Sequence, residues 1–134
     1  MIETALVAPV LAMMAVGAFE MGTMVQKQQE LQSAASEAEA IVLAAAAGDG
    51  VSSTKLKELL ATSTGIAPAD IVLEAKWRCG NASTFVDSST ACSSGQQVYA
   101  FVQTTFKGRY TPTWTSFGLG TPFNYNVVRT VQVG

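Results

Sequence analysis

Two carboxylates, Glu3 and Glu20, lie in an N-terminal segment, residues 1–25, whose other side chains are nearly all apolar. Pro9 lies between them, and the first basic residue of the chain is Lys27. An ionised carboxylate is costly inside a membrane and is usually paired there with another polar group. We therefore expect Glu3 in particular to meet a partner, so the chemistry expected of this segment is charge pairing.

The chain lacks the residues that most often carry catalysis. It has no histidine, which is the commonest general base and metal ligand. Its carboxylates are scattered without motif spacing, and no glycine-rich phosphate loop follows an expected strand. With 8 basic and 10 acidic residues the net charge is -2, which provides no broad attraction to nucleic acid. We therefore predict a protein that is not an enzyme, has no catalytic residues, holds no metal or cofactor and has no nucleic-acid partner.

Two cysteines, Cys79 and Cys92, flank a stretch of small and polar residues. A disulfide between them would close a loop that is otherwise free to move, and a loop of this length is worth about 3 kcal/mol by chain-entropy reasoning. The alternative is two free thiols, which would suit a cytosolic protein. Because the apolar N-terminal segment indicates export, we expect the disulfide.

A long stretch near the C-terminus, residues 108–123, is aromatic and carries no charge after Arg109. Connections of this length in compact domains are usually functional or held against another surface. We expect its aromatic side chains to cover the edge of their own sheet. The alternative is that they form an adhesive or subunit-contact surface for another molecule. These side chains are Tyr110, Trp114, Phe117 and Phe123.

One long helix is expected to carry the two carboxylates, from about Glu3 to Ala47. Its first half is apolar almost all round, and residues 4–25 would span about 33 Å as a helix, enough to cross a bilayer. Its second half is amphipathic, with one row that we expect to pack against the rest of the chain. That row comprises Met24, Gln28, Leu31, Ala35, Ala38, Val42 and Ala45.

Small residues recur in the first half of this helix, and they include Gly17 and Gly22. Small side chains let helices approach closely, whereas Pro9 removes a backbone donor and the glycines weaken the helix. We expect this segment to kink or unwind locally and to repack among copies of itself. Because no basic stretch precedes the apolar run, we also expect that a basic leader has been removed and that Met1 lies near the mature N-terminus.

The rest of the chain is expected to form a small head. A short helix is predicted over residues 51–62, followed by three strands over residues 71–79, 97–107 and 125–133. The predicted fold class is α+β, with the long N-terminal helix packed on a small antiparallel sheet of about three strands. We expect two parts: residues 1–25 form an assembly or transmembrane helix, and residues 26–134 form a globular head that includes the amphipathic half of the helix.

The N-terminal residues resemble a known family. The run from Ile2 to Val10 (IETALVAPV), followed by residues 17–22 (GAFEMG), is similar to the signature of TadE-like pilins of the tight-adherence (Tad/Flp) branch of type IV pili. The resemblance continues more weakly in the Tyr110-Thr-Pro112 element and in a last strand that contains Arg129. Glu3 stands two residues nearer the N-terminus than the glutamate of the family pattern.

The resemblance implies a type IV pilin-like fold and a pilin life cycle. Such a protein is made with a basic leader, cleaved by a prepilin peptidase, stored in the bacterial inner membrane and extracted by an assembly platform into a helical filament on the cell surface. Glu3 would then offset the N-terminal amine of a neighbouring subunit. Glu20 would either fix subunit register or lie near the membrane surface, and Pro9, Gly17 and Gly22 complete the expected assembly residues.

These features together predict a structural pilin subunit that polymerises through its N-terminal helix into a Tad-like type IV pilus for surface attachment. One alternative is a membrane-anchored periplasmic module of a secretion or pilus machine that does not polymerise. Another is a minor pilin for adhesion or DNA capture, which depends on the aromatic residues near the C-terminus.

Overall fold

The structure is a computed structural model that describes residues 2–48 and 52–134, with side chains from Thr4 onward in the first helix. Its two helices are α1 (Ile2–Ala47) and α2 (Ser53–Thr64), and its strands are β1 (Ile71–Cys79), β2 (Val98–Tyr110) and β3 (Phe123–Gln132). The strands form one antiparallel sheet in the order β1-β2-β3. The predicted α+β class, with a long helix on a three-stranded sheet, is confirmed.

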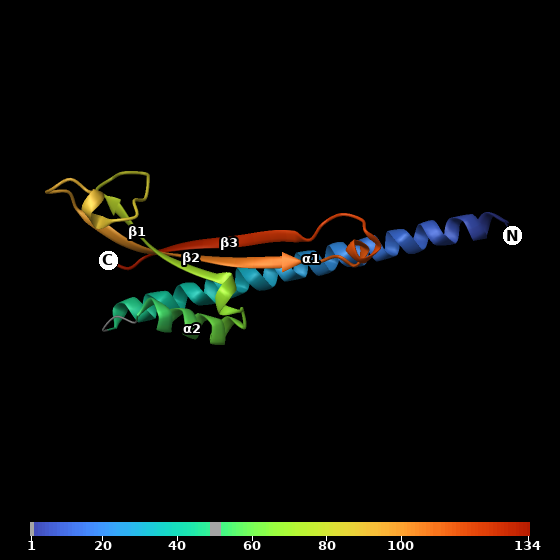
Figure 1. Cartoon of the computed structure of the whole chain (residues 1–134), viewed down its shortest axis with the longest axis horizontal. Helices are drawn as coiled ribbons and strands as arrows, with labels where there is room; N and C mark the ends of the chain where they lie inside the picture. Colours follow the sequence, from blue (N-terminus) through green and yellow to red (C-terminus); the bar gives the residue numbers. More distant parts are fainter. Residues whose placement is uncertain (1, 49–51) are drawn as a thin grey trace.

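The helix α1 runs the length of the molecule and carries the head on its C-terminal part (Figure 1). It remains helical through Pro9, and its glycines also lie inside it. By length and composition α1 is able to cross a membrane. Between residues 4 and 16 every side chain is exposed, because the head does not reach this part of the helix.

From residue 17 onward one stripe of α1 turns toward the head. From Leu31 onward buried residues recur at spacings of three and four, and Glu20 lies eleven residues, or three helical turns, before Leu31 on the same face. The buried residues of this stripe are Glu20, Leu31, Ala35, Ala38 and Val42. The row predicted from the sequence is confirmed at its apolar positions, but Gln28 is exposed. A long polar side chain can stay in water at the edge of such a stripe.

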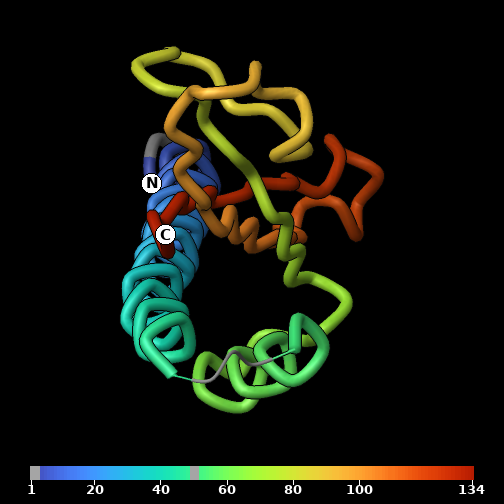
Figure 2. Tube along the Cα trace, turned by 90° about the vertical axis from the view of Figure 1, so that its left-hand side faces the viewer, coloured from blue at the N-terminus to red at the C-terminus, as the bar shows by residue number. Residues whose placement is uncertain are grey.

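The core lies where this stripe meets α2 and the sheet (Figure 2). Leu60 from α2, Ile71 from β1 and Phe106 from β2 are fully buried there, and alanines on α1 let these larger side chains approach its backbone. Phe106 is paired across the sheet with Ile71 and Val127, so the central strand presents its inward side chain to α1 between two apolar neighbours.

Local signals at both ends of α2 agree with the observed bounds. The hydroxyl of Ser52 accepts a hydrogen bond from the backbone N–H of Lys55 at 3.4 Å, which satisfies one of the free donors of the first turn. Gly65 ends the helix in the left-handed region with φ 69°. The helix is shifted by two residues toward the C-terminus from the predicted range of 51–62.

Strands β2 and β3 extend further than predicted, up to Tyr110 and from Phe123. One pair beyond the predicted end of β2 is a close cross-strand contact, in which the ring of Tyr125 lies over its register partner Gly108. A Cβ atom at Gly108 would come within 2.4 Å of this ring, so only glycine fits beneath it. The added pairs shorten the irregular connection to residues 111–122, which we call the β2–β3 loop.

Candidate functional site

The carboxylate of Glu20 is the most deeply buried charged group of the described chain. Only 3% of this residue is exposed, although it belongs to a helix segment whose neighbouring side chains face outward. Glu20 lies four residues before Met24, on the stripe of α1 that packs against the head. A buried carboxylate is stable only when other groups donate hydrogen bonds to it.

Those donors come from the last residue of β2 and from the start of the β2–β3 loop. The backbone N–H of Thr113 donates a hydrogen bond of 3.0 Å to Oε1 of Glu20. The hydroxyl of Thr113 donates to the same oxygen, and the hydroxyl of Tyr110 donates to Oε2. Three donors therefore fasten the loop to α1, an arrangement that we call the Glu20 clasp, comprising Glu20, Tyr110 and Thr113.

The clasp raises the pKa of the Tyr110 hydroxyl. The hydrogen bond to the Glu20 carboxylate raises the pKa of Tyr110, because loss of the phenol proton would remove the bond and place two negative charges together. Burial acts in the same direction. The Tyr110 hydroxyl is therefore held as a donor throughout the neutral and mildly alkaline range.

The loop itself is stabilised by short-range contacts beyond the clasp. Pro112 is buried and precedes a short 3₁₀ helix, Thr113–Phe117, and the Thr115 hydroxyl donates to the Pro112 carbonyl at 2.7 Å. Gly118 ends this helix in the left-handed region with φ 75°, and the backbone N–H of Leu119 donates to the Trp114 carbonyl at 3.3 Å. These contacts give the uncharged loop a defined turn.

The four aromatic residues singled out from the sequence divide into two pairs. Tyr110 and Trp114 are half-buried, whereas Phe117 is 81% exposed and Phe123 is 44% exposed. The loop lies beside α1, near the part of the helix drawn in blue (Figure 1). Tyr110 is held by α1 through the clasp, which neither of the sequence-based expectations for this residue included.

Comparison with known protein families gives one match, and it covers the part of the chain that carries Glu20. Residues 1–39 match the model of the TadE-like protein family. The predicted resemblance is thus confirmed for this part, which we call the TadE-like segment. No curated protein and no solved structure matches the chain.

The expected assembly residues of the TadE-like segment are spread along one helix. The side chain of Glu3 lies outside the described residues. Pro9 and Gly22 are exposed, and no atom lies within 4 Å of a Cβ placed on Gly17 or Gly22. No described residue outside the helix lies against these two positions, so their role in close approach between helices stays a prediction.

The disulfide expected between Cys79 and Cys92 is present, with 5.3 Å between the two Cα atoms. Cys79 is the last residue of β1, at the end of the head that lies away from the exposed N-terminal part of α1 (Figure 1). The loop closed by this bond is also tied to β1 by an ion pair of 2.6 Å between Lys76 and Asp87. The covalent link and the Glu20 clasp therefore fasten opposite ends of the head.

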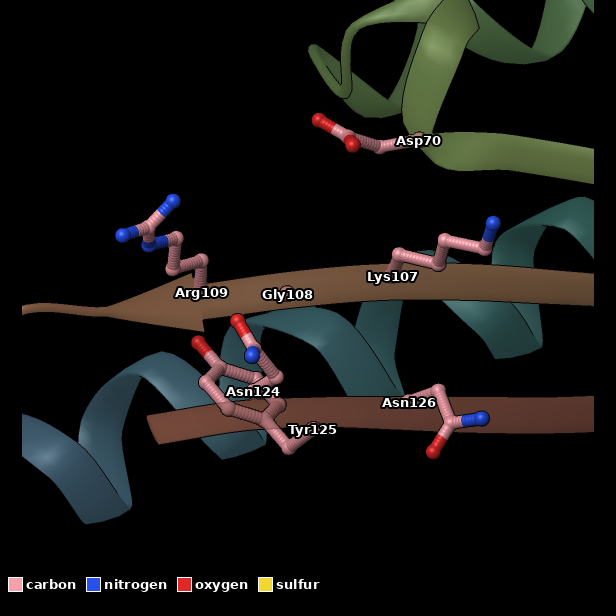
Figure 3. A pocket seen from close by; sticks show the side chains of 7 residues that line it. All are labelled: Asp70, Lys107, Gly108, Arg109, Asn124, Tyr125 and Asn126. Atoms are coloured by element: carbon pink, nitrogen blue, oxygen red, sulfur yellow. The ribbon is translucent and has the colours of Figure 1, made fainter. Parts of the chain in front are cut away.

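A shallow hollow of about 390 Å³ lies on the face of the sheet opposite the TadE-like segment (Figure 3). Lys107 and Arg109 extend from β2 on one side of it, and Asp70 faces them from the turn before β1. Asn124 and Asn126 are their partners on β3. All five side chains are exposed, and the lining residues include no pair of nucleophile and general base. The hollow is an open surface of the head, lined by these polar side chains and by Tyr125.

Sequence reasoning did not assign a partner to Glu20, and it did not single out Thr113. One signal for the first was available, because the row that begins at Met24 continues by one helical step to Glu20. That step predicts an inward-facing carboxylate. No periodicity in the chain marks Thr113 as its donor, because the two residues are 93 positions apart.

Proposed function

We propose that this protein is a pilin subunit that polymerises through its TadE-like segment into a Tad-type filament for surface attachment. The observation that carries the proposal is the exposure of the N-terminal part of α1, residues 4–16, which we call the free half of α1. From residue 4 to residue 16 all side chains are exposed, and most of them are apolar. A single chain cannot cover this surface, so it requires either lipid or other helices.

Lipid and a bundle of helices surround the free half of α1 at two successive stages of pilus assembly. Before assembly the free half lies in the bacterial inner membrane, and after cleavage by a prepilin peptidase an assembly platform transfers it into a bundle of identical helices. The heads then form the outer surface of the filament. The two proposed parts differ in purpose, since residues 1–25 assemble the filament and residues 26–134 shape its exterior.

Glu3 has a specific role in this scheme. In a bundle of apolar helices, its carboxylate pairs with the N-terminal amine of a neighbouring subunit, and that pairing selects one register because a mispaired charge in a dry bundle is costly. Pro9, Gly17 and Gly22 allow the helix to adjust its path as it leaves lipid.

The test is a Glu3→Ala variant, with Glu39→Ala as the matched control because Glu39 is an exposed acid on the packed half of α1. We expect Glu3→Ala to leave the subunit folded and in the membrane but to abolish filaments, measured by electron microscopy of sheared cell-surface material. Glu39→Ala should still polymerise. Normal filaments from Glu3→Ala would refute the charge-pairing role.

The second candidate is a membrane-anchored module that does not polymerise. The structural feature that favours it is the one-sided stripe of α1, since a helix that is packed on its own head needs no further copy to complete the fold. Mass spectrometry of purified filaments distinguishes the two functions. A repeating component of the filament is required by the first and excluded by the second.

A further inference from the structure

The tip of the β2–β3 loop is an exposed apolar surface on an otherwise well-fastened segment. Phe117 is 81% exposed and Leu119 is 64% exposed, and residues 111–122 contain no charged side chain. A loop that merely connects two strands in water is usually polar at such positions. The exposed apolar side chains therefore indicate a contact that the single chain does not make.

The clasp places this tip next to the apolar half of α1. Glu20 fastens the start of the loop, and its neighbours on the helix include Phe19 and Val16, which are 76% and 55% exposed. Figure 2 looks along α1, and in that view the loop reaches sideways from the helix. A bilayer crossed by the helix would have its surface parallel to this direction.

We propose that the β2–β3 loop is an interfacial membrane anchor, whose Trp114, Phe117 and Leu119 rest in the headgroup region of a bilayer crossed by residues 4–19. This inference rests on the proposed function, in which α1 lies in a membrane before assembly. Tryptophan is enriched at the boundary between lipid and water, and the exposed side chains of Phe117 and Leu119 beside Trp114 are apolar. The absence of charge from the loop removes the usual obstacle to such contact.

The clasp also determines how deep the helix can lie. If the bilayer core extended to residue 25, the Glu20 carboxylate and the irregular backbone that binds it would enter hydrocarbon, where free polar groups are strongly disfavoured. With the membrane boundary at Glu20, residues 4–19 form a helical segment about 24 Å long inside the bilayer. A bilayer core is about 30 Å thick, and local thinning accommodates a difference of this size.

With the membrane boundary at Glu20, Glu20 and the β2–β3 loop together hold the protein at one depth in the membrane. The head supplies the donors for a carboxylate at the membrane surface, and the carboxylate holds the aromatic tip against the lipid. The clasp therefore marks where α1 leaves the lipid, and the depth of the protein in the membrane is set by contacts on both α1 and the loop. Extraction into a filament withdraws the tip from the lipid together with the helix.

Tryptophan fluorescence in vesicles tests the anchor, because the chain has two tryptophans, Trp77 and Trp114. The full chain is reconstituted into phosphatidylcholine and phosphatidylglycerol vesicles that contain lipids brominated at shallow or deep positions of the acyl chain. In the Trp77→Phe variant only Trp114 reports. We expect shallow bromines to reduce its emission at least about twofold relative to unbrominated vesicles, and deep bromines to quench it less.

The Trp114→Phe variant provides the matched control, because Trp77 lies on β1 in the head and should not be quenched. If Trp77→Phe does not fold, the difference between the native chain and Trp114→Phe gives the same result. A second pair separates the tip from the rest of the surface: Phe117→Asp should reduce the quenching of Trp114, whereas Val128→Asp, an exposed site on the sheet, should not.

Flotation of the same vesicles separates failure of the anchor from failure of the proposed function. If the chain does not float with the vesicles, α1 is not inserted and the proposed function itself fails. If the chain floats but Trp114 is unquenched, the anchor is refuted. Emission that changes only when subunits polymerise would likewise refute it, because the tip would then contact a second copy.

Discussion

The two halves of α1 share one continuous helix and differ in almost everything that surrounds it. In the N-terminal half the side chains are exposed on all sides, as at Leu11, which is 59% exposed. In the C-terminal half one stripe is removed from water by α2 and the sheet, and Ala38 there is 1% exposed. The border between them lies at Glu20, which the head holds with three hydrogen bonds.

The difference shows that an unbroken helix need not be one functional unit. Backbone hydrogen bonds continue through both halves, so the halves are distinguished by side-chain burial and not by secondary structure. One half contributes to the stability of the head, and the other contributes a surface for assembly. Changes in the two halves should therefore affect different measurements.

The largest effect is expected when a charge is placed on the buried stripe. Ala38→Glu puts an unpaired carboxylate in the core and should destabilise the head by more than about 3 kcal/mol, enough to unfold it. The measurement is thermal unfolding of the full chain in detergent, followed by circular dichroism.

The matched change in the free half is Ala12→Glu, which places the same charge on an exposed position. Its melting temperature should equal that of the native chain, whereas its insertion into membranes should fall, since a charged side chain near the centre of a helix costs about 3 kcal/mol there. Equal loss of head stability in both variants would contradict the division of α1.

A smaller effect on stability is expected when one leucine in each half of α1 is replaced by alanine. Leu31 is 7% exposed, and Leu31→Ala removes buried atoms from the core and should cost about 2 to 5 kcal/mol. Leu11→Ala removes the same atoms from an exposed position and should change stability by less than about 0.5 kcal/mol. The measurement is chemical denaturation of the two variants in detergent. If both variants unfold at the same reduced denaturant concentration, the free half also packs on the head.

The Glu20 clasp is expected to show coupling between the two regions that it joins. Tyr110→Phe and Glu20→Ala each leave polar groups without partners and should lower the melting temperature less than Leu31→Ala does. Both variants should also speed chymotrypsin cleavage after Phe117, because the loop is released. In a double-mutant cycle the losses of unfolding free energy caused by Tyr110→Phe and Glu20→Ala should not be additive. The losses caused by Tyr110→Phe and Glu39→Ala should be additive.

The smallest effect is expected in alkaline titration. Because the pKa of Tyr110 is raised in the folded chain, its contribution to stability is complete below the ordinary tyrosine value of about 10 and is lost as the pH rises through the higher folded value. Absorbance of tyrosinate should therefore show a late-titrating phenol in the native chain that is absent from Tyr110→Phe. A late step that persists in this variant would assign the shift to another tyrosine.

Much of the fold was predictable from local patterns. The alternation of residues 71–79 predicts β1, the spacing of apolar residues predicts the stripe on α1, and the cysteine pair predicts the disulfide, all of which the structure contains. Strand ends were less predictable, because Gly108 reads as an interruption of β2 until the ring of Tyr125 is seen to cover it. That contact joins residues that are not adjacent in the sequence.

The sequence by itself determined the long helix, its two kinds of surface and the TadE-like signature, because each is expressed by residues within a few helical turns of one another. Only the tertiary structure decided what Glu20 does. Its donors are Tyr110 at the end of β2 and Thr113 in the loop that follows, 90 and 93 positions away, and their approach depends on how the sheet packs on α1. A carboxylate that local patterns describe as an unpaired charge is, in the folded chain, the group that fastens the head to the helix.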